Sequence, residues 1–271
     1  MRIVAALVLL LTACGRTFAA QEPPPKRSPE EIRKLLASKP APANPRLLKL
    51  TLVASKQDHG PGEHDYPAWQ TNWTKLLKKS KALEVSSAWQ WPTSEQFKES
   101  DAILFYFWNH DWSEDRYREV DAFLQRGGGL LMLHSASIAD KEPEALAKRI
   151  GLAFQPGRSK YRHGALDLKL VATADNPITR DLPREIHFVD ETYWPMIGDP
   201  KDVNLLATAE EEGKPWPMMW TVQKGKGRVF VSILGHYGWT YEDPLFRIMV
   251  LRALAWSVAE PIERFEHLAL E

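Results

Sequence analysis

The chain has 271 residues and a mass of 30.9 kDa, which suits one substantial core of ordinary domain size. Lys plus Arg and Asp plus Glu are equal at 35 each, so no overall charge attracts nucleic acid or an anionic membrane surface. Cys14 is the single cysteine, which excludes intrachain disulfides and cysteine-based zinc sites. Histidine and carboxylate chemistry remains for the body of the chain.

Residues 1–20 have the pattern of an export signal. One Arg precedes an apolar stretch at 3–11 that is too short to span a bilayer as a helix. Two processing outcomes stay open: "LTAC" resembles a bacterial lipobox with lipidation on Cys14, whereas "TFA" at 17–19 suits ordinary signal-peptidase cleavage. We expect an exported bacterial protein, either periplasmic or held at the outer face of a membrane through a lipid anchor alone.

Residues 21–46 are rich in proline at both ends and predict a semi-rigid tether that contains one short helix. Ser28 is the expected N-cap of that helix, with Pro29 at its first position and Glu31 completing a capping box. The body is expected over 47–260. The last residues, 261–271, are expected to form a C-terminal tail.

The first half of the body alternates apolar runs with amphipathic segments. Strands are expected at 47–55, 83–90, 102–108 and 130–136, and helices at 67–80 and 113–126. Trp69 and Trp73 share the apolar face of the first helix and are assigned to packing, while Ser113 is the expected N-cap of the second helix. Apolar runs that alternate with helices predict a parallel sheet covered on both faces, the doubly wound α/β class.

The second half of the body is richer in strands. Strands are expected at 164–173, 186–194, 203–211 and 216–235, the last being interrupted by a turn at 224–227. A helix over 243–260 is expected to be capped by Asp243, with Pro244 at its first position. A strand that ends near Gly235 and leads into this helix restores the α/β pattern after a strand-rich insert.

Most of the eight histidines fall where the expected strands end. In open α/β sheets, ligands bind beyond the carboxyl ends of the parallel strands. The loops after the first, third, fourth and last of these strands and the insert contribute His59, His64, His110, His134, His236 and His163. His110 is expected to be a cap or surface residue. His134 and His236 follow buried runs, where an imidazole must find hydrogen-bond partners, so they are the favoured functional residues.

Four motifs give the chain a family resemblance. "GGGLLMLHSA", "DETYW" and "GKGRVFVSILGHYGWTYEDPLFRIMVLRALAW", with "DHGPGEHDYPAWQ" upstream, resemble the ThuA-like (trehalose-utilisation) family over about 47–260. The resemblance implies a flavodoxin-like or class I glutamine amidotransferase-like fold: a mostly parallel sheet with helices on both faces. It also implies a role in disaccharide catabolism that includes 3-keto-sugar intermediates.

The comparison with amidotransferases also implies where the chemistry differs. The elbow that carries a nucleophilic cysteine in those enzymes carries His134 here, and Gly235-His236 resembles the position of their base. Because the body has no cysteine, glutamine hydrolysis through a thioester is excluded. Ser135 lacks the G-x-S-x-G context of a serine nucleophile.

Two chemistries stay open for the histidines. In one, His64, His134 and His236 bind a divalent metal, with zinc the best match to nitrogen-rich ligation, and Asp65 or Glu191 completes the shell. In the other, His134 and His236 work as acid and base without a metal, with Glu191 and its neighbour Asp190 orienting them or sharing protons. Both suit proton abstraction beside a sugar carbonyl, and hence a lyase, hydrolase or isomerase of keto-sugars.

A small saccharide is the expected partner, because carboxylates beside aromatic rings commonly line sugar pockets. The expected substrate-binding residues are His59, Trp112, Tyr193, Trp194, Tyr237 and Trp239. A non-catalytic carbohydrate-binding lipoprotein, or an accessory subunit of a degradation complex, is the alternative to an enzyme.

Overall fold

The computed structural model describes residues 21–36, 40–171 and 176–271. The expected export signal and Cys14 lie outside the described residues. Within those ranges, no helix has both the length and the apolar composition needed to cross a membrane.

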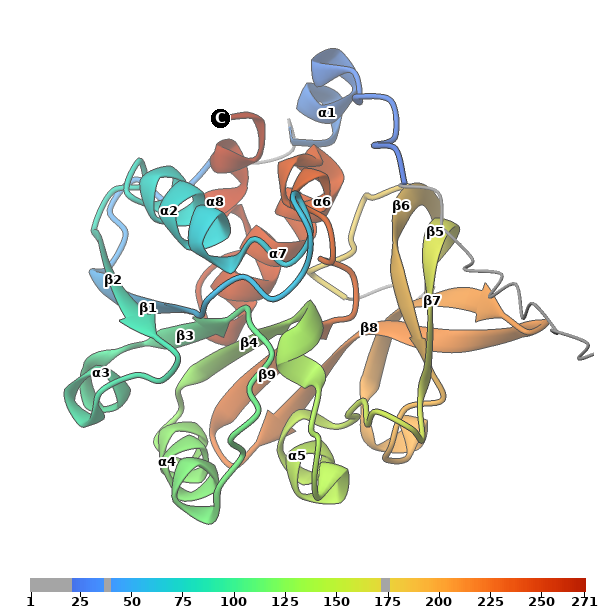
Figure 1. The fold of residues 1–271 in the computed structure, drawn as a ribbon. Coiled ribbons are helices and arrows are strands. Elements are labelled where there is room, and N and C mark those ends of the chain that lie inside the picture. Colours follow the sequence, from blue (N-terminus) through green and yellow to red (C-terminus); the bar gives the residue numbers. More distant parts are fainter. Residues whose placement is uncertain (1–20, 37–39, 172–175) are drawn as a thin grey trace, which may run out of the picture.

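Among the described residues, nine strands form one sheet in the order β2-β1-β3-β4-β9-β8-β7-β5-β6 (Figure 1). The strands are β1 (Leu48–Ala54), β2 (Leu83–Trp89), β3 (Ala102–Phe105), β4 (Gly129–Leu133), β5 (Lys160–Leu170), β6 (Glu185–Trp194), β7 (Asn204–Glu211), β8 (Lys214–Lys224) and β9 (Gly227–Ser232). The first five strands in this order run parallel, which is the flavodoxin-like arrangement. The predicted α/β fold class is therefore confirmed.

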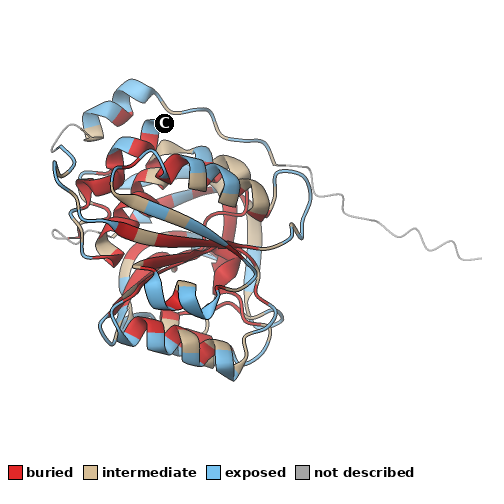
Figure 2. Cartoon of the chain, turned by 90° about the vertical axis from the view of Figure 1, so that its left-hand side faces the viewer, coloured by how far each residue is buried: buried red, intermediate tan, exposed pale blue. Residues whose placement is uncertain are grey.

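Helices cover both faces of the parallel half (Figure 1). The helices of the described residues are α1 (Pro29–Leu36), α2 (Tyr66–Leu77), α3 (Ser94–Glu99), α4 (Glu114–Gln125), α5 (Pro143–Ile150), α6 (Gly238–Glu242), α7 (Pro244–Ser257) and α8 (Glu263–Glu266), with 3-10 helices η1 (His134–Ser137), η2 (Pro200–Asp202) and η3 (His267–Leu270). α2 and α7 lie on one face, and α3, α4 and α5 on the other. The central strands are consequently buried between two layers whose outer surfaces are exposed (Figure 2).

Local signals fixed several helix ends as predicted. The side chain of Ser113 accepts a hydrogen bond from the amide of Arg116, and that of Asp243 accepts from Leu245 and Phe246. Trp69 and Trp73 are buried at 4% and 2% exposure, as their shared helical face predicted. These contacts explain why α2, α4 and α7 were recognisable from the sequence.

The strands at the site edge are shorter than expected. The expected strand over 130–136 ends at Leu133, because His134 takes a φ of 51° and starts η1. The expected strand over 102–108 ends at Phe105, and β9 ends at Ser232 rather than near Gly235. At β4 the early ending places the polar side chains of His134 and Ser135 beyond the strand, in η1.

The second half is an antiparallel extension of the sheet. β9 pairs with β8, β8 with β7, β7 with β5 and β5 with β6, all antiparallel. The predicted turn joins β8 to β9, where Lys224 pairs with Gly227. β6 crosses back toward the parallel half and brings its buried second half, 190–194, beside the ends of β4 and β9 (Figure 1).

The expected C-terminal tail is wrong as a description of 261–271. This segment forms α8 and η3 and packs on α7, with Phe265 and Leu268 at 0% exposure. Buried Arg252 of α7 donates to Glu266, and Arg264 donates to the carbonyl of Lys81 at 2.7 Å. The apolar positions of so short a segment gave no clear period from which its packing could be predicted.

The described part of the expected tether also contacts the body. Arg27 pairs with Asp243 at 2.7 Å, and its guanidinium lies 5.2 Å from the centroid of Phe188. The helix α1 begins at Pro29 as predicted, and its Ile32 is buried at 2% exposure. This segment therefore contacts the domain at Arg27 and Ile32, although most of its described residues are exposed.

Candidate metal and catalytic site

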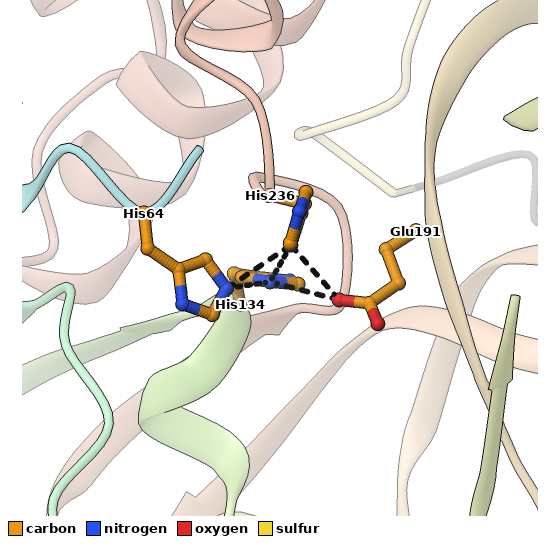
Figure 3. A group of neighbouring side chains, drawn as sticks. All are labelled: His64, His134, Glu191 and His236. Atoms are coloured by element: carbon orange, nitrogen blue, oxygen red, sulfur yellow. Dashed lines mark hydrogen bonds and ion pairs between the residues drawn. The ribbon is translucent and has the colours of Figure 1, made fainter. Parts of the chain in front are cut away.

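Three imidazoles and one carboxylate meet at the carboxyl edge of the parallel strands (Figure 3). His64 comes from the loop between β1 and α2, His134 follows β4, His236 follows β9, and Glu191 comes from β6. All four are buried, with exposures of 2%, 0%, 0% and 5%. The expected convergence of His64, His134 and His236 is thus what the fold produces, and Glu191 rather than Asp65 is the carboxylate beside them.

The backbone at two of these histidines is in the left-handed region. His64 has a φ of 45° and His134 a φ of 51°, values that non-glycine residues rarely adopt. Backbone strain of this kind persists where the surroundings enforce it, and it concentrates at functional sites. At His134 it makes the sharp elbow after β4 that turns the imidazole over the end of the sheet.

Hydrogen bonds fix which nitrogen of His134 and of His64 faces the cluster. His134 Nδ1 donates to the carbonyl of Ile233 at 2.6 Å, so its Nε2 points to the centre. His64 Nδ1 lies 2.6 Å from Asp58 Oδ1, which can only accept as a carboxylate, and its Nε2 also points to the centre. Such carboxylate and carbonyl partners orient histidines that ligate metals.

Five of the six separations among the four inward atoms are close to tetrahedral spacing. His64 Nε2 is 2.8 Å from His134 Nε2 and 3.1 Å from His236 Nδ1, and the latter two nitrogens are 3.3 Å apart. Glu191 Oε2 is 3.2 Å from His134 Nε2 and 3.1 Å from His236 Nδ1. Ligands about 2.0–2.1 Å from a tetrahedral zinc ion are separated by about 3.3 Å. The donor set and its spacing therefore fit zinc.

The charge state of the cluster suits a cation as well. Burial lowers the pKa of His64 to about 3 and lowers the pKa of His236, so both rings are neutral at pH 7. Burial opposes ionisation of Glu191, but hydrogen bonds to His134, His163 and His236 hold its pKa well below the ordinary value. The centre thus combines the neutral imidazoles of His64 and His236 with a carboxylate anion.

The loops that carry His64 and His236 are fastened to each other. The amide of His64 donates to the carbonyl of His236 at 2.9 Å, and the amide of Gly238 donates to Gly62 at 2.9 Å. Gly235 has a φ of 133°, and a Cβ there would lie 2.5 Å from the hydroxyl of Tyr241. Glycine is therefore required immediately before His236.

Asp190 stabilises the backbone of the loop that carries His236. Its carboxylate accepts from the amides of Gly235 at 3.0 Å and His236 at 2.9 Å, and from the hydroxyl of Thr240. Burial raises its pKa above the ordinary value. Asp190 was predicted as a catalytic residue, but the structure commits both of its oxygens to backbone and hydroxyl donors, so it positions His236.

Two further histidines, His59 and His163, lie at the partly exposed edge of the cluster, which we call its mouth. His163 Nε2 lies 3.0 Å from Glu191 Oε1, and its ring is 4.4 Å from the ring of His236. The ring of His59 is 3.9 Å from that of His64, and its Nδ1 is 2.7 Å from Asp58. Their hydrogen bonds to these carboxylates raise the pKa of both histidines. His59 from the β1–α2 loop and His163 from the strand-rich insert thus both lie beside the cluster, as their positions in the sequence predicted.

Some of the expected aromatic residues are also at the centre. The hydroxyl of Tyr193 is 3.3 Å from His134 Nε2, and the ring of Tyr237 is 4.6 Å from that of His236. Trp239 stacks on Tyr237 at 4.1 Å and donates to the carbonyl of Val189. Tyr193 is buried at 2% exposure and Tyr237 at 3%, which leaves little of either ring free for a sugar.

Trp112 and Trp194 are not brought to the cluster. Trp112 stacks on Tyr117 at 5.5 Å and meets Trp91 edge-on, so it packs in the α4 layer. Trp194 is separated by an odd number of residues from Glu191 and Tyr193, which puts it on the opposite face of β6. The expectation that these two rings bind substrate is wrong.

Two other predicted residues have structural or surface roles. Asp65 caps α2 by accepting from the amide of Ala68 at 3.1 Å, which explains why it is not the fourth member of the cluster. His110 is exposed and pairs with Asp140 at 2.7 Å, as expected for a surface residue.

Asp58 and Tyr66 were missed as members of the site. Asp58 contacts both His59 and His64, and the hydroxyl of Tyr66 lies 2.8 Å from His64 Nδ1 and 3.0 Å from Ser135 Oγ. The signal for Asp58 was its place in the same loop as both histidines. Tyr66 gave no signal, because an aromatic residue at the start of an amphipathic helix reads as core.

Solved structures with the same fold define the class of the molecule. The chain is similar to putative ThuA-like proteins from Parabacteroides merdae (TM-score 0.63, 22% identity, covering 80% of this chain and 92% of that one) and Bacteroides uniformis (TM-score 0.65, 15% identity, 83% and 99%). It also matches about a third of a cold-adapted β-galactosidase from Rahnella sp. R3 (TM-score 0.56, 16% identity, 80% and 32%). These likenesses define a flavodoxin-like, glutamine amidotransferase-like α/β protein.

The family model described as "Trehalose utilisation" (ThuA) matches residues 51–257. The chain belongs to this family, as its motifs indicated. A search of curated proteins gave no match. The family associates the chain with carbohydrate utilisation.

Proposed function

We propose that the protein is a zinc-dependent enzyme that moves a proton beside the carbonyl group of a 3-keto-glycoside. The supporting observation is the 2.8 Å separation of His64 Nε2 and His134 Nε2. When each ring keeps its proton on Nδ1, both Nε2 atoms are acceptors, and two facing lone pairs repel each other. A shared cation removes that repulsion.

The proposed ligands are His64, His134, His236 and Glu191. Histidine nitrogen and carboxylate oxygen are donor types found at catalytic zinc, and a substrate oxygen would have to enter as a fifth ligand beside these four. Bound there, the ion supplies Lewis-acid polarisation of a substrate carbonyl oxygen. The buried setting strengthens that electrostatic effect, because little water competes with it.

His59 and His163 are then the imidazoles that remain for proton transfer. Each has one ring nitrogen bound to a carboxylate, and its second nitrogen has no hydrogen-bond partner among the described residues. A keto group acidifies the neighbouring C–H bond, so one base at the mouth can take that proton and an acid can return it elsewhere. Elimination and isomerisation of a keto-sugar both begin this way.

The saccharide substrate is proposed from the family and from the aromatic residues around the mouth. The same proposal includes an activity outside the cytoplasm, which the export-signal pattern of residues 1–20 supports. Neither the saccharide substrate nor the location of the activity depends on the identity of the ion.

The test combines metal analysis with turnover. The purified chain is analysed by elemental mass spectrometry, then incubated with 3-keto-trehalose and with trehalose, with and without a chelator, and the products are identified by mass spectrometry. We expect about one zinc ion per chain. We also expect new products from the keto-sugar alone, loss of turnover with chelator, and recovery when zinc is added.

His134→Gln and His187→Gln form the matched pair of variants. His187 is an exposed histidine paired with Asp167, remote from the cluster. Only His134→Gln should lose zinc and reduce turnover by orders of magnitude. Turnover that survives complete metal removal would favour acid–base work by His134 and His236 instead. Sugar binding without turnover of any sugar would favour a non-catalytic binding protein.

A further inference from the structure

Tyr161 is an exposed aromatic residue beside the cluster. It is 62% exposed, and among the described residues Trp89 is the other large aromatic side chain classed as exposed, at 54%. Single exposed apolar residues are common and need no explanation by themselves. What distinguishes Tyr161 is its place on β5.

The register of the sheet puts Tyr161 at the mouth of the site. It lies on the same face of β5 as His163, two residues on, and directly opposite Tyr193 of β6. Its ring centroid is 5.7 Å from that of His163, which is in turn 4.4 Å from the ring of His236. The His163 ring thus lies next to both Tyr161 and the buried centre.

Tyr161 differs from the other aromatic residues there in having a free surface. Tyr237 and Trp239 stack on each other, and Tyr193 lies against Phe154 with centroids 4.3 Å apart. Burial or mutual stacking thus occupies much of these rings. Aromatic faces left open to solvent suit the C–H faces of a pyranose.

We infer that Tyr161 forms an outer saccharide subsite, which stacks on the sugar unit next to the one held at the centre. The substrate is then a disaccharide or a longer glycoside rather than a monosaccharide. This inference rests on the proposed saccharide function, and it does not depend on the metal or on catalysis.

The test compares Tyr161→Ala and Tyr161→Phe with Trp89→Ala, a control on β2 at the opposite edge of the sheet. Affinities for 3-keto-trehalose, trehalose and 3-keto-glucose are measured by calorimetry, alongside KM and kcat for the keto-sugars. Tyr161→Ala should weaken disaccharide binding about tenfold, as expected for loss of one stacking contact, with kcat nearly unchanged. Tyr161→Phe and Trp89→Ala should bind like the parent chain.

The outcomes separate the subsite from the proposed reaction. Weaker disaccharide binding by Tyr161→Ala supports the subsite even if no sugar is turned over, and in that case the proposed enzyme activity alone fails. The subsite is overturned if Tyr161→Ala binds disaccharides as the parent does, if it weakens monosaccharide binding equally, or if the parent binds none of these sugars.

Discussion

At the scale of single residues, the centre depends on groups that hold the histidines in place. Asp58 fixes the ring of His64, the backbone carbonyl of Ile233 fixes the ring of His134, and Asp190 fixes the backbone at His236. None of the three is a proposed metal ligand. Replacing Asp58 or Asp190 should therefore loosen the donors without deleting any of them.

Asp58→Asn should weaken zinc binding. His59 and His64 both bond to the same oxygen, Oδ1, and a neutral amide oxygen is a weaker acceptor than a carboxylate oxygen, so both rings should be held less firmly. We expect a loss of about 10–100-fold in zinc affinity, measured by competition with a chromophoric chelator. Asp167→Asn breaks an exposed Asp–His pair and serves as the control. Equal affinities in the two variants would refute the positioning role of Asp58.

Asp190→Asn should destabilise the fold itself. Replacing one buried oxygen by NH₂ sets a donor against the amide of Gly235 or His236. The expected cost is about 2–3 kcal/mol in the free energy of unfolding, measured by urea denaturation. Asp121→Asn removes an exposed carboxylate paired with Arg149 and should cost under about 1 kcal/mol. A stability equal to that of this control would contradict the role given to Asp190.

The sequence predicted part of the site for a physical reason. His134 and His236 follow apolar runs, and strand ends on one edge of a parallel sheet are neighbours, so their meeting could be inferred. Which carboxylate joins the histidines, Glu191 or Asp65, could not be inferred, because it depends on how β6 crosses back to the parallel half. The environment of Trp112 was likewise set by Trp91 and Tyr117, from segments whose packing has no local signature.

At the scale of elements, helix caps and turn residues were readable, whereas short amphipathic pieces were not. α3 and α5, with 6 and 8 residues, went unpredicted, and residues 261–271 were taken for a tail. So few residues complete only one or two helical turns, which is too little for a period to stand out. Their structure comes from tertiary packing.

Phe265→Ala tests whether the C-terminal segment is part of the core. Because this ring is at 0% exposure, its truncation should cost about 3–5 kcal/mol in the free energy of unfolding. Leu270→Ala, in the same segment but 36% exposed, should cost much less. Urea denaturation of both variants gives the comparison, and equal losses would show that the segment contributes little specific packing.

At the scale of the whole molecule, buried tyrosines make the fold sensitive to alkali. Burial raises the pKa of Tyr117 to about 12 and raises those of Tyr106 and Tyr241 well above the ordinary value. Above pH 10 the unfolded chain releases phenolic protons that the folded chain retains. Stability is therefore complete below about pH 10 and falls as pH rises, by up to about 1.4 kcal/mol per pH unit for each such tyrosine.

Tyr117→Phe should flatten this decline between pH 10 and 12, because its hydroxyl has no hydrogen-bond partner in the described structure and little is lost at neutral pH. Thermal unfolding followed across pH 8–11.5 measures the slope. Tyr161→Phe changes an exposed ring and should leave the slope as it is. A slope unaffected by Tyr117→Phe would mean that other groups dominate alkaline unfolding.

The backbone bonds between the loops at 62–64 and 236–238 have a consequence for access. Two loops joined by backbone hydrogen bonds resist separation, so they close the cluster on the side where they meet. His163 is partly exposed on β5, beside Tyr161. A sugar of the proposed kind would reach the histidines along this strand, with its far end still on Tyr161.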